Sequence, residues 1–66
     1  MTLTVNGTVI DREGQPTVRA LLDSLGVLHR RVALMINGDV LPRDAYEHTV
    51  LREGDVVDVL SLAGGG

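Results

Sequence analysis

The residues best suited to chemistry stand at the end of the sequence, where Leu62 and Ala63 lead into Gly64, Gly65 and Gly66. Because glycine has no side chain, these residues form a bare backbone ribbon that can enter a channel too narrow for other peptides. The reactive group is then the carboxylate of Gly66. Extended over Ala63 to Gly66, the chain can carry this carboxylate roughly 13 Å from a folded body, into the active site of another protein.

A glycine end without any role is the alternative, because chain ends are commonly disordered. Side chains elsewhere offer little competing chemistry. The absence of cysteine excludes thiolate metal sites and sulfur nucleophiles in the chain itself. His29 and His48 stand far apart without further ligands, which disfavours a metal site. We interpret Asp44 and Glu47 as surface charges, since nothing in the sequence indicates a pocket for an acid/base pair.

Composition limits the class of protein. A chain of 66 residues forms one small domain, and its hydrophobic content of 44% is too high for a disordered segment. No apolar run approaches the ~20 residues that span a bilayer, and no secretory signal opens the sequence, so we expect a cytoplasmic protein without membrane contact. The net charge of -3 disfavours nucleic-acid binding. All six basic residues are arginines, so the chain has no lysine to accept a modifier.

Two Asn-Gly dipeptides predict two hairpins. Asn6-Gly7 joins strands over 2–5 and 8–11, and Asn37-Gly38 joins strands over 32–36 and 39–41. A two-residue turn sets Leu3 opposite Ile10 and Val5 opposite Thr8, which puts Leu3, Val5 and Ile10 on the buried face.

A short helix is predicted between the hairpins. Thr17 is the expected N-cap and Gly26 the expected stop. Apolar residues at i, i+3, i+4 and i+7 form one stripe that must pack on the sheet, namely Val18, Leu21, Leu22 and Leu25. After the second hairpin we expect a single turn over 43–48, with Tyr46, the only aromatic residue, against the edge of the domain.

The last strand is predicted over 56–62, with Val57 and Val59 facing inward and Leu60 and Leu62 outward. Exposed leucines beside a reactive tail make Leu60 and Leu62 the expected docking residues for a partner. The element order favours an α+β fold of the β-grasp (ubiquitin-like) type, with a mixed sheet of four to five strands on one helix. Its first and last strands lie parallel at the centre. We expect a domain over residues 1–62 and a flexible glycine tail over 63–66.

Four local features carry a resemblance to a known family: the strand that ends in Asn6, the helix entry over 15–25, the Leu41-Pro42-Arg43 sequence, and Gly54-Asp55 before the strand that leads to the glycine end. In this order and chain length the sequence resembles the ThiS-type sulfur carriers, ubiquitin-like proteins of thiamine biosynthesis. Pro16 is an insertion relative to the usual helix entry.

The resemblance implies a reaction at the terminal carboxylate, which is anionic at neutral pH and needs activation before a nucleophile can attack it. An E1-like adenylating enzyme of the ThiF type uses MgATP to convert Gly66 to an acyl-adenylate. Sulfur from a donor such as a cysteine desulfurase then yields a thiocarboxylate, which a thiazole synthase of the ThiG type consumes. Gly64 and Gly65 thread through the partner. The chain itself binds no cofactor and has no catalytic residue, so it is a co-substrate rather than an enzyme.

Two alternatives remain open. One is the small subunit of a molybdopterin synthase or a carrier for another sulfur-transfer pathway, since similar glycine tails serve those systems. The other is a ubiquitin-like binding module whose tail is never activated. Fold alone does not separate these functions.

Overall fold

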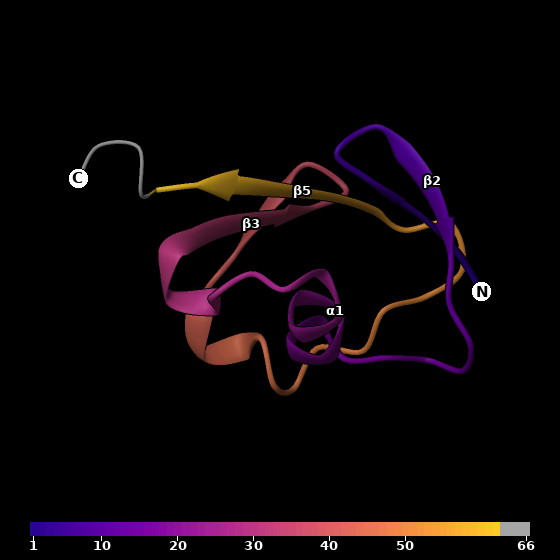
Figure 1. Ribbon diagram of the computed structural model, residues 1–66, viewed down its shortest axis with the longest axis horizontal. Helices are drawn as coiled ribbons and strands as arrows, with labels where there is room; N and C mark the ends of the chain where they lie inside the picture. Colours follow the sequence, from indigo (N-terminus) through magenta and orange to yellow (C-terminus); the bar gives the residue numbers. More distant parts are fainter. Residues whose placement is uncertain (63–66) are drawn as a thin grey trace.

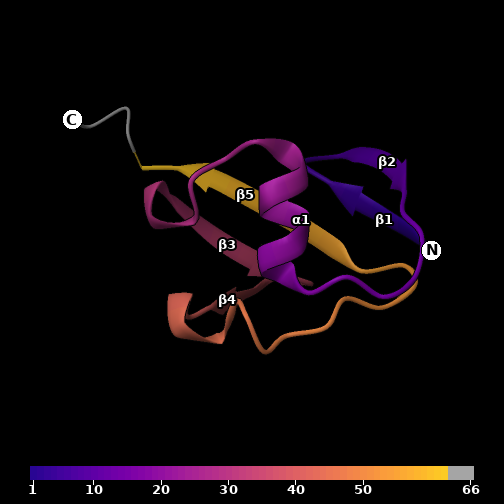
Figure 2. The same ribbon diagram turned by 60° about the horizontal axis from the view of Figure 1, so that its bottom comes forward.

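Two β-hairpins flank the last strand in the computed structural model, which describes residues 1–62. In chain order the elements are β1 (Thr2–Val5), β2 (Thr8–Asp11), α1 (Val18–Leu25), the 3-10 turn η1 (His29–Arg31), β3 (Val32–Ile36), β4 (Asp39–Leu41), the 3-10 turn η2 (Arg43–Ala45) and β5 (Val56–Ser61). They form one five-stranded sheet in the order β2-β1-β5-β3-β4, and α1 lies across one face of it (Figure 1, Figure 2).

The sheet is mixed because its two central strands run parallel. β1 and β5 pair with Thr4 beside Val56 and Val5 beside Val57. The other neighbouring strands are antiparallel. A parallel pair requires a long crossover, and here that crossover contains α1 and the second hairpin. The expected α+β fold of the β-grasp type is therefore confirmed.

Both hairpins turn as the Asn-Gly dipeptides predict. Asn6 and Gly7 have φ of 49° and 81°, and Asn37 and Gly38 have φ of 52° and 87°. Positive φ at both central residues is the type I′ geometry, which matches the twist of the flanking strands. In the first hairpin Leu3 lies opposite Ile10 and Val5 opposite Thr8, as predicted.

The helix begins and ends where its capping residues stand. The Thr17 hydroxyl oxygen accepts a hydrogen bond of 3.1 Å from the Ala20 N–H, and Gly26 ends α1 in the left-handed region at φ 74°. Of the predicted apolar stripe, Leu25 at the last turn is 37% exposed. The other three residues are buried, namely Val18, Leu21 and Leu22.

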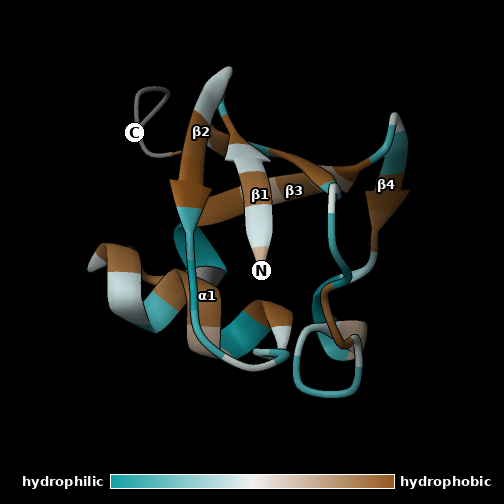
Figure 3. Ribbon diagram, turned by 90° about the vertical axis from the view of Figure 1, so that its right-hand side faces the viewer, coloured by the Kyte–Doolittle hydropathy of each residue, from teal (hydrophilic) through white to brown (hydrophobic). Residues whose placement is uncertain are grey.

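The core fills the space between α1 and the sheet. Figure 3 shows hydrophobic residues recurring along the strands and on part of α1, with hydrophilic residues in the loops. The buried members come from three strands, the helix and the chain before β5: Leu3, Val5, Val18, Leu21, Leu22, Val32, Leu34, Tyr46, Leu51 and Val57. No polar or charged residue is buried among those whose burial the structure describes, 1–28 and 30–62.

The expectation for Tyr46 is wrong, because its side chain belongs to the core and is only 2% exposed. The segment between η2 and β5 passes beside the N-terminal end of α1. Arg19 N–H donates to the Tyr46 carbonyl at 3.1 Å, and Leu51 N–H donates to the Pro16 carbonyl at 2.9 Å. These bonds draw Tyr46 and Leu51 under the helix, where they close the core at one end.

The last strand has the predicted alternation. Val57 is fully buried and Val59 packs against the core, while Leu60 is 50% and Leu62 is 54% exposed. β5 ends at Ser61, one residue earlier than predicted, although the Leu62 N–H still donates a hydrogen bond to the Arg31 carbonyl. The predicted flexible tail over 63–66 falls outside the described residues, so the boundary between domain and tail stays a prediction.

Candidate functional site

The glycine end is attached to the central strand of the sheet. β5 has β1 on one side and β3 on the other, and it leads the chain away from the end of the molecule where Met1 lies (Figure 1). After β5, the Leu62 N–H donates to the carbonyl of Arg31 at 2.8 Å, so the last described residue is still fixed to the domain. Gly64, Gly65 and Gly66, the predicted threading and modification residues, lie beyond the part of the chain that the structure describes.

Two asparagine side chains hold β5 in place. Asn6 accepts a hydrogen bond from the Val59 N–H through Oδ1 at 2.7 Å. Asn37 accepts one from the Val56 N–H at 2.9 Å, and its Nδ2 donates to Asp55 at 3.1 Å. Where β1 and β3 end, the asparagine side chain of the hairpin turn therefore takes over hydrogen bonding to the backbone of β5.

Sequence reasoning missed this second role of the two asparagines. An Asn-Gly pair predicts a turn because both residues accept a positive φ. Which strand lies beside that turn depends on the order of strands in the sheet. The usable signal was the parallel pairing of the first and last strands, which brings the turn at Asn6 against the middle of β5.

The predicted docking residue Leu60 lies on the face of the sheet turned away from α1. Its cross-strand neighbour is Ala33, while Met35 lies between Val40 and Asp58 in the same sheet. We call the apolar residues of this face the outer-face patch: Val9, Ala33, Met35, Val40, Val56 and Leu60. Four of them are strongly exposed, namely Val9, Val40, Val56 and Leu60. The patch therefore extends the surface expected from Leu60 and Leu62 across the sheet.

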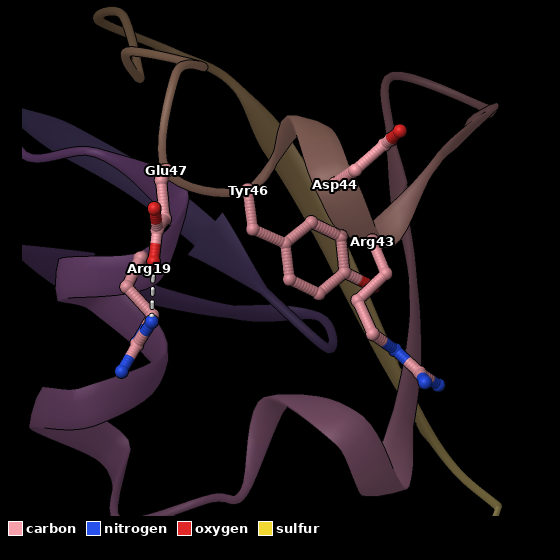
Figure 4. Close-up of a pocket in the computed structure, with 5 residues that line it drawn as sticks. All are labelled: Arg19, Arg43, Asp44, Tyr46 and Glu47. Carbon is pink, nitrogen blue, oxygen red and sulfur yellow. Dashed lines mark hydrogen bonds and ion pairs between the residues drawn. The ribbon is translucent and has the colours of Figure 1, made fainter.

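An open cavity of about 470 Å³ borders the segment that carries the acidic residues Asp44 and Glu47. Figure 4 shows Glu47 directed at Arg19, with Tyr46 between them and Arg43. The Arg19 Nη1 lies 2.8 Å from the Glu47 carboxylate, and its Nε lies 3.5 Å from Asp23 on the same helix. Glu47 thus forms an ion pair that ties α1 to the chain after η2. This arrangement supports a structural role for Glu47 rather than an acid/base pair with Asp44.

Among the side chains that the structure describes, in 1–28 and 30–62, no group of three or more histidines, aspartates or glutamates is placed to hold a metal ion. The same part of the chain contains no helix with the length and hydrophobicity that crossing a membrane requires.

Comparison with known proteins identifies the family of this chain. The ThiS family matches residues 3–66, which includes both the folded domain and the glycine end. This chain belongs to the ThiS family. The resemblance to the sulfur carriers of thiamine biosynthesis is therefore confirmed.

Solved structures of a ThiS family member agree with the fold. The crystal structure of the thiamine biosynthesis protein ThiS from Geobacter metallireducens is 39% identical to this chain, covers all of both chains and superposes with a TM-score of 0.85. The solution structure of a thiamine biosynthesis protein from the same organism gives a TM-score of 0.82 at 39% identity, over the whole of this chain and 88% of the other.

Curated relatives include two proteins named thiazole synthase, from Paramagnetospirillum magneticum and Magnetococcus marinus. Each is 35% identical over all 66 residues of this chain. The chain spans only about a fifth of the length of these relatives, since the match covers 20% of each. A third relative, the uncharacterized protein ycf40 of Porphyra purpurea, is 26% identical over 93% of its length.

Proposed function

We propose that this ThiS family carrier transports sulfur as a thiocarboxylate on Gly66. The observation that carries the proposal is the family match, which runs through the glycine end and not only through the fold. The position of β5 supports it, because a central strand offers a fixed base from which an extended end can enter a partner.

The chemistry starts with activation of the Gly66 carboxylate. One carboxylate oxygen attacks the α-phosphorus of MgATP in an E1-like, ThiF-type enzyme, which releases pyrophosphate and forms an acyl-adenylate. A persulfide sulfur from the donor then attacks the acyl carbon and displaces AMP. A thiol cleaves the resulting acyl disulfide, leaving the thiocarboxylate on the carrier and a disulfide on the donor side. The chain supplies the acyl group, and partner enzymes supply every catalytic group.

A thiazole synthase is the proposed recipient of the sulfur. Two proteins with that name contain a segment similar to this whole chain within a polypeptide about five times as long. Joining a carrier-like segment to the remainder of such a protein favours direct transfer between the two. The carboxylate form would then be regenerated for the next cycle of adenylation.

Mass spectrometry of the intact protein tests the proposal. After incubation with a ThiF-type enzyme, MgATP and a cysteine desulfurase with cysteine, we expect a mass increase equal to replacement of one oxygen by one sulfur. Fragmentation should place the change on Gly66. Protein incubated without MgATP is the control. A carrier that stays at its original mass with all components present would contradict the proposal.

We propose the outer-face patch, together with Leu62, as the docking surface for the adenylating enzyme. Its apolar side chains surround a single half-buried acid, Asp58, so an apolar partner surface with a basic residue fits it best. The position of Leu60 near the end of β5 puts this surface beside the base of the tail. An enzyme that receives the tail can therefore contact the patch at the same time.

Leu60→Asp is expected to weaken binding of the adenylating enzyme about tenfold or more, as loss of a central apolar contact does in other interfaces. The measurement is the dissociation constant by titration calorimetry. Val50→Asp is the matched control, because Val50 is 48% exposed, close to the 50% of Leu60, and comes from the chain before β5. Equal affinities for the two variants would remove the patch from the docking surface.

A further inference from the structure

A second surface lies at the base of the tail, on the helix side of the sheet. It is a groove of about 350 Å³ between the turn of the first hairpin, the chain that follows α1, and the end of β5. Its walls are mainly apolar. We call it the tail-root groove and define it by Asn6, Val27, Leu28, Arg31, Val59 and Ser61. Leu28, at its rim, is 54% exposed.

Backbone hydrogen bonds fix the helix-side wall of the groove. Gly26 turns the chain off α1, and the Val27 N–H then donates to the Leu22 carbonyl at 3.2 Å. The Arg31 N–H donates to the Leu28 carbonyl at 2.8 Å, which closes the turn of η1. Leu28 and Arg31 are therefore held at the groove before any partner arrives, which lowers the entropic cost of binding there.

The opposite wall is the part of β5 that has lost its β1 neighbour. β1 pairs with β5 only as far as Val57, whereas β3 follows β5 to Ser61. Past Val57 the chain leaves β5 at the turn of Asn6, and the Asn6 side chain, rather than the backbone of β1, accepts the hydrogen bond from the Val59 N–H. Beyond Val57, β5 therefore has no strand on its β1 side, and the space left there forms the groove.

The charge at the groove is basic although the whole chain has a net charge of -3. Arg31 lines the groove and is exposed, and Arg30 precedes it. The ion pairs among residues 1–62 involve the amine of Met1 and the guanidinium of Arg19, so the Arg31 guanidinium takes part in none of them. A carboxylate is the complementary group for such an arginine.

From this combination we infer that the tail-root groove binds an extended segment of the adenylating enzyme, with one leucine-sized side chain against Leu28 and Val59 and a carboxylate on Arg31. The inference rests on the proposed function. Continuity with the tail supports it, because the carbonyl of Arg31 itself accepts the Leu62 N–H. Residues 63–66 of the chain make a poor occupant, since one methyl group and three glycines cannot fill an apolar groove.

Two groove variants with matched controls test the inference. Arg31→Glu is compared with Arg52→Glu, an equal change of charge at an exposed residue before β5. Leu28→Asp is compared with Val50→Asp, which also replaces an aliphatic side chain with a carboxylate at similar exposure. Each full-length variant is first checked for an unchanged melting temperature. Dissociation constants are then measured with a ThiF-type adenylating enzyme and with a ThiG-type thiazole synthase from the same organism.

Both groove variants are expected to bind the adenylating enzyme about tenfold more weakly than their controls. The loss for Arg31→Glu should shrink as salt is raised, because salt screens the pair between an exposed arginine and a carboxylate. Affinities for the adenylating enzyme within twofold of the controls would overturn the inference, even if binding of the thiazole synthase were weakened. A loss that salt leaves unchanged would overturn the carboxylate partner.

The outcomes also separate this inference from the proposed function. If the wild-type protein gains sulfur on Gly66 while the groove variants bind like their controls, the proposed function stands and the groove assignment fails. If groove variants lose affinity but the wild-type protein never gains sulfur, the docking segment stands and the thiocarboxylate proposal fails. Absence of binding between the wild-type protein and the adenylating enzyme would overturn the groove assignment outright.

Discussion

Replacing Gly65 with valine is expected to abolish adenylation while the domain stays folded. A valine side chain in the middle of the glycine end adds a branched group where the partner channel is proposed to admit only backbone. A displacement of about 1 Å at a reacting group can cost about 100-fold in rate, so we expect a loss of at least that size. The measurement is ATP-pyrophosphate exchange with a ThiF-type enzyme, beside a thermal melt of the variant.

Gly65→Ala provides the graded control for this experiment. Its single methyl group should reduce exchange less than valine does. Both variants should melt at the wild-type temperature, because the buried residues of the described domain, 1–62, form the core without residue 65. Wild-type rates of exchange for Gly65→Val would contradict threading of the tail through a narrow channel. Unfolding of that variant would instead assign residue 65 to the stability of the domain.

Leu34→Ala is expected to remove much of the stability of the domain. Leu34 is fully buried on β3, between Val59 of β5 and Leu41 of β4. Truncation of a buried leucine to alanine costs about 2 to 5 kcal/mol, from the lost transfer energy and the cavity left behind. The whole free energy of unfolding of a 66-residue domain is roughly 3 to 10 kcal/mol, at about 0.05 to 0.15 kcal/mol per residue. Urea denaturation measures the difference.

Val40→Ala is the control, because Val40 is an apolar residue of the same sheet with 73% of its surface exposed. Its effect on the free energy of unfolding should stay within about 0.5 kcal/mol. If Leu34→Ala cost no more than Val40→Ala, the buried layer between α1 and the sheet would not be the source of stability.

Local signals made most of the fold predictable. Both hairpins follow from Asn-Gly dipeptides, whose backbone preference acts over two residues. The ends of α1 follow from two single residues. Thr17 accepts a hydrogen bond from a free N–H of the first turn, and Gly26 ends the helix in the left-handed conformation. The parallel centre was predicted from the order of the elements, in which a crossover that contains the helix joins the first and last strands.

Tyr46 and Leu51 show where prediction from the sequence ended. Neither residue belongs to a periodic pattern, because each stands in the irregular chain between η2 and β5. Their burial depends on bonds to Pro16 and Arg19, about 30 residues away along the chain. Such long-range pairing leaves no local trace in composition or spacing.

The candidate site divides in the same way. Exposure of Leu60 and Leu62 followed from alternation along one strand. The outer-face patch and the tail-root groove each combine several segments, so both required the strand order β2-β1-β5-β3-β4. The role of Gly66 came from the family resemblance and remains a proposal.

The central place of β5 has a mechanical consequence for a carrier. An enzyme that pulls on the glycine end pulls along a strand gripped from both sides, by Asn6 and β1 on one flank and by Asn37 and β3 on the other. Force along the strand loads the hydrogen bonds on both flanks at once, whereas an edge strand is bonded to the sheet on one side only. We therefore expect β5 to stay in the sheet when a partner holds the glycine end.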